Sequence, residues 1–268
     1  MTGSNYNFFS RPHVNIANRE AARREAAYLN SRQDECCCAF YDAGASTTTA
    51  IFGGSAEQFH ILSVASRLKT NVVVFNSEGS FWFKGSLHLP NIEEIGRDLA
   101  NDRFGKISVL FGQSSGGYAA LAASKHLEGA TAIAVSPQTF DDRAAKSSMR
   151  ISSFLKPSYT EADLLDLRQY LADATNSSQR AIILSASEYS TPYEGLFWID
   201  HLHGFRMIDV PTVQIFMLRS SLHSSVWRNA DNYAKMLADV AQCDSTEQRR
   251  DAIFAGTEVV SANVDSTG

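Results

Sequence analysis

Short apolar segments alternate with helical segments along most of this chain of 268 residues. The apolar segments are hydrophobic throughout rather than alternating with polar residues, which is typical of strands covered on both faces. Strands separated by helices form βαβ units and a mostly parallel sheet. The sequence therefore predicts an α/β fold with a mostly parallel central sheet flanked by helices. Strands are expected within residues 36–43, 47–54, 71–76, 106–112, 130–137, 181–187 and 212–219.

The same alternation suggests one main domain with additions. Residues 1–35 are expected to form an N-terminal helical leader, because 15–32 is rich in Ala, Arg and Glu. Residues 36–254 form the predicted domain. Within it, 139–178 is polar and helix-prone and interrupts the alternation, so we expect a small helical insertion that acts as a lid. Residues 255–268 are expected to be a polar C-terminal tail.

The charge and hydrophobicity of the chain exclude several classes of partner. The formal net charge is −5, so no excess of Lys and Arg is present to neutralise nucleic-acid phosphates. No apolar run approaches the ~20 residues of a membrane-spanning helix. The N-terminus lacks a basic segment followed by an apolar one, which is the pattern of a secretion signal. These features predict a cytoplasmic protein that binds no nucleic acid and does not span a membrane.

Three consecutive cysteines, Cys36, Cys37 and Cys38, raise the alternatives of a metal site and a buried strand. Zinc sites in sequence usually contain Cys-x2-Cys pairs, which are absent here. Neighbouring side chains of a strand point to opposite faces, so three adjacent thiolates converge poorly on one ion. We therefore expect a buried strand in which Cys acts as a small hydrophobic residue, and no metal.

The stretch Gly112-Gln113-Ser114-Ser115-Gly116 matches the pattern G-x-S-x-G. An expected strand precedes it and an expected helix, 116–127, follows it. This is the context in which a serine on a sharp strand-to-helix turn is presented as a nucleophile. A phosphate-binding loop is the alternative, but the P-loop lysine is missing and the G-x-G-x-x-G spacing is not met. Ser114 is thus the candidate nucleophile.

With this turn and strand order, the chain resembles the α/β-hydrolase family over roughly residues 36–242. The resemblance implies a catalytic acid and a histidine that follow the serine in the order Ser, Asp/Glu, His. Glu188, which comes after the strand at 181–187, is the expected acid. Asp200 is the alternative acid, although it lies inside an apparent helix.

The same order implies that the catalytic histidine follows the last strand. His223 occupies that place. His201 and His203 are alternatives, but both precede the last strand. The other histidines lie in segments that the family does not use for its base, namely His13, His60, His88 and His126.

An oxyanion hole needs two hydrogen-bond donors. The backbone N–H of Ser115, directly after the nucleophile, is expected to be one. The second is expected in the loop that follows the strand at 47–54. Gly53 and Gly54 allow close backbone approach there, and Gly54 is the preferred donor. The alternative is that Gly53 and Gly54 only form an ordinary turn between a strand and a helix, without an oxyanion-hole role.

The residues and the resemblance together predict a serine hydrolase that cleaves an ester or thioester through an acyl-enzyme on Ser114, without metal or organic cofactor. An acyltransferase that uses a sugar or carrier acceptor, and a non-catalytic binding module on the same scaffold, remain alternatives. The stretch 134–140 resembles hydrolase-like proteins of bacterial surface-polysaccharide biosynthesis, so the substrate is expected to be a small molecule or glycan ester. The aromatic residues at 81–83 would line the substrate pocket or belong to the core.

Overall fold

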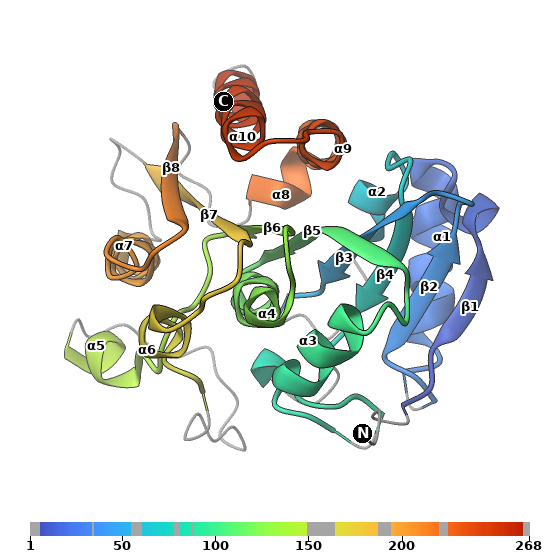
Figure 1. The fold of residues 1–268 in the computed structure, drawn as a ribbon, viewed down its shortest axis with the longest axis horizontal. Helices are drawn as coiled ribbons and strands as arrows, with labels where there is room; N and C mark the ends of the chain where they lie inside the picture. Colours follow the sequence, from blue (N-terminus) through green and yellow to red (C-terminus); the bar gives the residue numbers. More distant parts are fainter. Residues whose placement is uncertain are drawn as a thin grey trace.

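The computed structural model describes residues 6–33, 35–54, 61–77, 81–86, 88–148, 164–186, 194–219 and 225–264. The fold is a single eight-stranded sheet with helices on both faces (Figure 1). The strands are β1 (Phe9–Pro12), β2 (Cys38–Asp42), β3 (Thr47–Phe52), β4 (Asn71–Phe75), β5 (Lys106–Gln113), β6 (Thr131–Val135), β7 (Gln179–Ala186) and β8 (Val213–Arg219).

The strand order across the sheet is β1-β2-β4-β3-β5-β6-β7-β8. Strands β3 to β8 are parallel to one another, whereas β2 is antiparallel to β4 and parallel to β1. The predicted α/β class with a mostly parallel sheet is therefore confirmed. Because the six parallel strands end at one edge, the loops that follow them are brought together there.

Two apolar layers hold the helices against the sheet. One layer contains side chains of α3 (Ile92–Ala100), α4 (Ser115–Ala123) and α6 (Leu167–Ala172). The opposite layer contains side chains of helices at both ends of the chain, which lie along the other face in Figure 1. These are α1 (Arg19–Asn30), α2 (Leu62–Ala65), α9 (Ala230–Ala241) and α10 (Thr246–Val264), and the remaining helices are α5 (Arg143–Ser148), α7 (Glu194–Phe205) and α8 (Ser225–Arg228).

Both ends of the chain are more ordered than the sequence pattern suggested. The leader contains the expected helix α1, but it also contains strand β1, which pairs with β2 at the edge of the sheet. Of the expected polar tail, residues 255–264 belong to helix α10. Val260 and Ser261 are buried, and Ser261 Oγ accepts a hydrogen bond from the Arg219 N–H. The buried residues here include Thr257 and Ser261, whose hydroxyls donate to the carbonyl oxygens of Ile253 and Thr257, so a count of polar residues misses this buried face.

The predicted insertion at 139–178 is described only at its two ends. At the second end, Leu167 and Leu171 of α6 are buried in the same layer as α4, and the Leu165 N–H donates to Tyr118 Oη at 3.2 Å. This end is therefore part of the core. Residues 149–163 lie outside the described residues, so the lid over Ser114 stays a prediction.

The three consecutive cysteines are all buried, as expected, but only Cys38 belongs to strand β2, and Cys36 and Cys37 precede it. Burial raises the pKa of the Cys36 and Cys38 thiols. The Cys36 thiol donates to the carbonyl oxygen of Asn7 at 2.8 Å, which joins the leader to the sheet.

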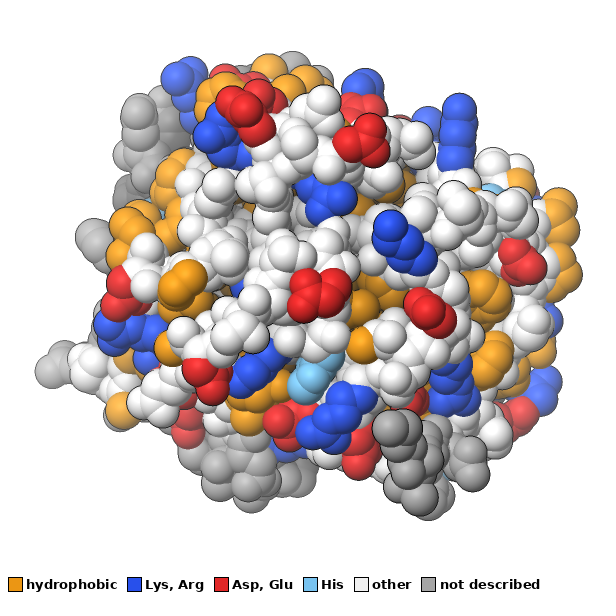
Figure 2. Space-filling view, viewed as in Figure 1, with side chains coloured by type: hydrophobic (Ala, Val, Ile, Leu, Met, Phe, Trp, Pro, Cys, Tyr) orange, Lys and Arg blue, Asp and Glu red, His pale blue; other side chains and the backbone are white. Residues whose placement is uncertain are grey.

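Surface features fit the charge balance of the sequence. On the face drawn in Figure 2, the described acidic and basic side chains are interspersed. None of the helices in the described ranges is long and apolar enough to cross a membrane.

Candidate active site

Ser114 lies at the turn between β5 and α4, at the edge of the sheet where the parallel strands end. Its backbone has φ 57° and ψ −123°, a conformation that L-amino acids other than glycine rarely adopt. Two hydrogen bonds hold it there. The Ser114 N–H donates to the Val135 carbonyl oxygen at 2.9 Å, and the Tyr118 N–H donates to the Ser114 carbonyl oxygen at 3.1 Å.

The glycines of the G-x-S-x-G pattern are required by close backbone contacts. A Cβ atom on Gly112 would lie 2.2 Å from the carbonyl carbon and oxygen of Gly116. A Cβ atom on Gly116 would lie 2.3 Å from the carbonyl oxygen of Phe52, at the end of β3. Any larger residue would force the turn to move. These glycines therefore fix the place of Ser114 between β5, α4 and β3.

Backbone N–H groups are available beside Ser114. The first N–H groups of a helix have no acceptor within that helix, and Ser115 is the first residue of α4. After β3, the Gly53 N–H donates to the Phe75 carbonyl oxygen at 2.8 Å and is thereby used. The structure records no acceptor for the Gly54 N–H among the described residues. This difference favours Gly54 over Gly53 as the second oxyanion donor, and both assignments stay predictions.

One side chain that the sequence analysis did not single out contacts the Ser114 hydroxyl. Gln138 Oε1 accepts a hydrogen bond from Ser114 Oγ at 3.2 Å and another from Trp82 Nε1 at 3.1 Å. The sequence signal that could have indicated Gln138 is its position shortly after β6, because β6 is next to β5 in the sheet and β5 leads to Ser114. Trp82 and Phe83 are both buried, so the aromatic stretch belongs to the core at these two positions.

Three buried polar side chains near this edge have no hydrogen-bond partner within the described residues. They are Asn76 directly after β4, Ser115 at the start of α4, and Ser136 directly after β6. Ser136 also has a positive φ of 41°. Unpaired buried polar groups and strained backbone are uncommon and cluster at functional sites. The end of the sheet that carries Ser114 is therefore the candidate active site.

No family model matches the sequence, and a search of curated proteins found no match. Solved structures do match. MenH from S. aureus superimposes with a TM-score of 0.52 and 13% identity, over 80% of this chain and 99% of that chain. The chain has the α/β-hydrolase fold. The Pyrococcus furiosus esterase Pf2001 also matches, with a TM-score of 0.47 and 14% identity, over 75% of this chain and 84% of that chain. A lipase-esterase related protein from Clostridium acetobutylicum matches with a TM-score of 0.47 and 13% identity, over 73% of this chain and 95% of that chain.

Glu188 and His223 lie outside the described residues, as does His60. The alternative acid, Asp200, is buried in α7.

The alternative histidines are engaged elsewhere. His203 is fully buried, its Nδ1 accepts the Thr139 N–H at 2.9 Å, and its Nε2 is 3.0 Å from Asp142 Oδ2. Both ring nitrogens are therefore occupied, and His203 has no nitrogen left for Ser114. His201 Nε2 contacts the Ser185 carbonyl oxygen at 3.0 Å. His126 also has a partner, because its Nε2 is 3.0 Å from Tyr170 Oη. His126 follows the C-terminal end of α4, whereas Ser114 precedes the N-terminal end of that helix.

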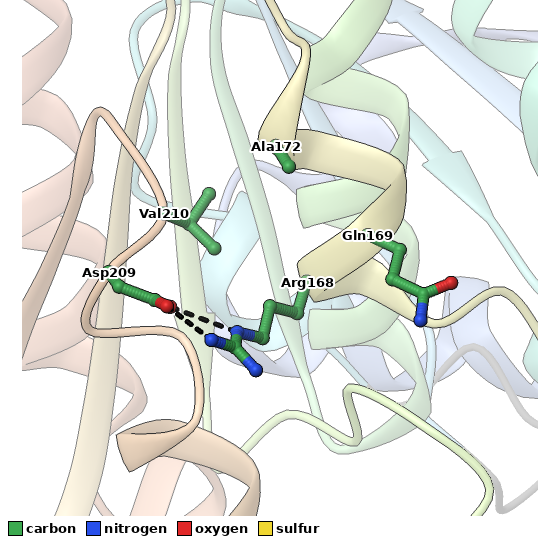
Figure 3. A pocket seen from close by; sticks show the side chains of 5 residues that line it. All are labelled: Arg168, Gln169, Ala172, Asp209 and Val210. Carbon is green, nitrogen blue, oxygen red and sulfur yellow. Dashed lines mark hydrogen bonds and ion pairs between the residues drawn. The ribbon is translucent and has the colours of Figure 1, made fainter.

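The described residues also line a pocket of about 280 Å³. Figure 3 shows Arg168 of α6 reaching across it to Asp209, with two hydrogen bonds between the guanidinium and the carboxylate. Asp209 and Val210 precede β8, and the other lining residues, Arg168, Gln169 and Ala172, belong to α6. Neither Ser114 nor Gln138 is among the residues that line it, so this pocket is distinct from the candidate site.

Proposed function

We propose that this protein is a serine hydrolase that cleaves an ester or thioester of a small molecule or glycan through an acyl-enzyme on Ser114. The observation that carries the proposal is the strained backbone of Ser114 on a strand-to-helix turn whose glycines cannot be replaced without moving it. A protein retains such strain only where the surrounding structure imposes it, and this is common at catalytic residues. The α/β-hydrolase fold supports the same function.

In the proposed reaction, the Ser114 oxygen attacks the carbonyl carbon while His223 accepts the hydroxyl proton. Glu188 orients the imidazole and stabilises its charged form. The backbone N–H groups of Ser115 and Gly54 stabilise the negative charge that develops on the carbonyl oxygen. His223 then protonates the leaving group, and water releases the acyl group. The full use of His203 by Thr139 and Asp142 supports His223 as the base.

A fluorophosphonate probe tests the nucleophile directly. The wild-type protein should become labelled on the peptide that contains Ser114, as read by mass spectrometry. Ser114→Ala should abolish labelling. Ser115→Ala is the matched control and should still be labelled, because only the backbone of Ser115 is used. Absence of labelling in the wild type, or labelling on Ser115, would contradict the proposal.

The acid and base are tested by paired variants. Glu188→Gln should reduce hydrolysis of p-nitrophenyl acetate far more than Asp200→Asn does. His223→Ala should remove most of the rate, whereas His201→Ala should retain it. The wild-type rate should rise with pH through one ionisation near pH 6.5, because the base must be neutral to accept the proton. A normal rate and pH profile in His223→Ala would assign the base to another residue.

A further inference from the structure

The carboxamide of Gln138 has a defined orientation beside the nucleophile. An indole N–H is only a donor, so the Gln138 atom that faces Trp82 Nε1 at 3.1 Å is the oxygen. The same oxygen accepts the Ser114 hydroxyl at 3.2 Å. The two donors together place the amide nitrogen, Nε2, on the other branch of the carboxamide.

Gln138 Nε2 is a donor group without an acceptor in the described part of the protein. The structure records hydrogen bonds only to Gln138 Oε1, and the residue is half-buried rather than enclosed. Nε2 is bonded to the same carbon as Oε1, and Oε1 is in contact with the atom that attacks the substrate. Two N–H bonds are therefore available to a ligand whose carbonyl carbon approaches Ser114 Oγ.

The segment that carries Gln138 is held by α7. The Thr139 N–H donates to His203 Nδ1, and Thr139 Oγ1 lies 3.0 Å from the carbonyl oxygen of His203. The Arg206 guanidinium donates to the Thr139 carbonyl oxygen at 3.2 Å and lies 4.5 Å from the centre of the Phe140 ring. These contacts leave the backbone after Gln138 little freedom to move.

The other partner of Gln138 is also held in place. Trp82 and Phe83 have positive φ values of 57° and 56°, which cost free energy in residues with a large side chain. Phe83 packs edge-on against Phe52, with ring centres 5.5 Å apart. The indole that orients Gln138 is thus fixed by strained backbone and by core packing. A donor positioned from both sides in this way is suited to recognition of a substrate.

We infer that Gln138 is a specificity-determining residue, whose Nε2 donates to an oxygen acceptor that the substrate carries close to the scissile carbonyl. This inference rests on the proposed function of Ser114. The substrate class is an ester or thioester with a hydroxyl, ether or carbonyl oxygen near the reacting carbon, in the acyl or the alcohol half. A site built to hydrogen-bond a substrate discriminates against an analogue that lacks the polar atom, because the site's donor is then left unpaired.

Isosteric esters test this inference. In the acyl half, p-nitrophenyl methoxyacetate and p-nitrophenyl butyrate differ by one oxygen in place of one methylene. In the alcohol half, 2-methoxyethyl acetate and butyl acetate differ in the same way. Values of kcat/KM are divided by the rates of uncatalysed hydroxide hydrolysis. The wild type should prefer the oxygen-containing ester of at least one pair by about tenfold.

Two variants assign the preference to Gln138. Gln138→Glu keeps the size and the oxygen that faces Ser114 and Trp82 but has no N–H donor, and Gln138→Leu removes both polar atoms. The preference should disappear in Gln138→Leu, and it should disappear or reverse in Gln138→Glu. Gln169→Leu, at an exposed position of α6, is the matched control and should retain it.

The outcomes separate this inference from the proposed function. If Ser114 is labelled by the fluorophosphonate but neither ester pair is distinguished, or the preference persists in both Gln138 variants, this inference alone is overturned. If the wild type is not labelled, the proposed function fails and this inference fails with it. Labelling together with a preference that depends on Gln138 supports both.

Discussion

Strand β4 has an asparagine at each end, and the two are treated differently. Asn71, where the strand begins, accepts hydrogen bonds from the Ala43 and Ala45 N–H groups at 2.9 and 3.1 Å and donates to the Ala45 carbonyl oxygen at 2.9 Å. Asn76, directly after the strand, is fully buried, and neither polar atom of its side chain has a partner in the described structure. The first asparagine is used for stability, whereas the second is left with unused hydrogen-bonding capacity.

The same contrast extends along the two edges of the sheet. Where the strands begin, Thr49 and Thr70 share a hydrogen bond of 2.8 Å, and the buried Arg180 donates to several neutral acceptors that include Ser124 Oγ at 2.7 Å. Where they end, Ser115 and Ser136 are buried and unpaired within the described residues. In parallel α/β sheets the ligand binds beyond the carboxyl ends of the strands. The comparison leads to the hypothesis that one edge stabilises the fold and the other, which we call the ligand edge, binds the substrate.

The largest expected effect is at the ligand edge. Ser114→Gly should reduce ester hydrolysis by about 10³-fold or more, because the attacking oxygen is lost. The free energy of unfolding should stay within about 1 kcal/mol, because relief of the positive φ offsets the greater chain entropy of glycine. Steady-state kinetics and urea denaturation measure the two quantities. A large loss of stability would mean that Ser114 has a structural role and would weaken the comparison.

Arg180→Met tests the opposite edge. Burial lowers the pKa of Arg180 to about 10, and its guanidinium donates to the side chains or carbonyls of Ser124, Asn176 and Ser178. Removal of these donors leaves buried acceptors unpaired, so the free energy of unfolding should fall by about 3 kcal/mol. The rate of fluorophosphonate labelling at 25 °C should be unchanged. A slower labelling rate in the folded variant would show that the two edges are coupled.

The two asparagines of β4 provide a matched pair. Asn71→Leu should lower the free energy of unfolding by about 2 kcal/mol, since three hydrogen bonds are lost. Asn76→Leu should change it by less than about 1 kcal/mol, because no hydrogen bond within the described protein is lost. Urea denaturation of both variants measures the difference. Equal losses would remove the contrast with which this comparison begins.

The smallest expected effect concerns the pH dependence of stability near the C-terminal end of α4. Burial lowers the pKa of His126, beyond the end of α4 that is remote from Ser114, and the nearby Arg97 and Lys125 lower it further. A depressed pKa means that the unfolded chain binds a proton more readily than the folded one. Stability should therefore be fully present above pH ~6.5 and decline as the pH falls below it. The decline in melting temperature between pH 7 and pH 5 should be smaller in His126→Gln, and an identical decline would contradict the assignment.

Prediction from sequence succeeded where the signal is local. The apolar runs at 71–76 and 106–112 correspond to β4 and β5, since continuous burial on both faces leaves a clear mark on a strand. The turn around Ser114 was recognised because Gly112, Ser114 and Gly116 lie close together in the chain. Strand β1 was missed, because a short edge strand is defined by its pairing with β2 rather than by its own pattern. The end of α10 was missed because its few buried residues are separated by polar ones.

The sequence by itself determined the α/β class and the place of the strand-to-helix turn at Ser114, because each depends on residues that are close together in the chain. The need for glycine at 116 depends in addition on the approach of Phe52 at the end of β3, which is a tertiary contact. Tertiary structure alone decided that Gln138 contacts Ser114, that both ring nitrogens of His203 bond to Thr139 and Asp142, and that Asn76 is buried with no partner among the described residues. These facts depend on the order of strands in the sheet. That order brings loops far apart in sequence to one edge, and no local pattern of hydrophobicity encodes which polar side chains meet there.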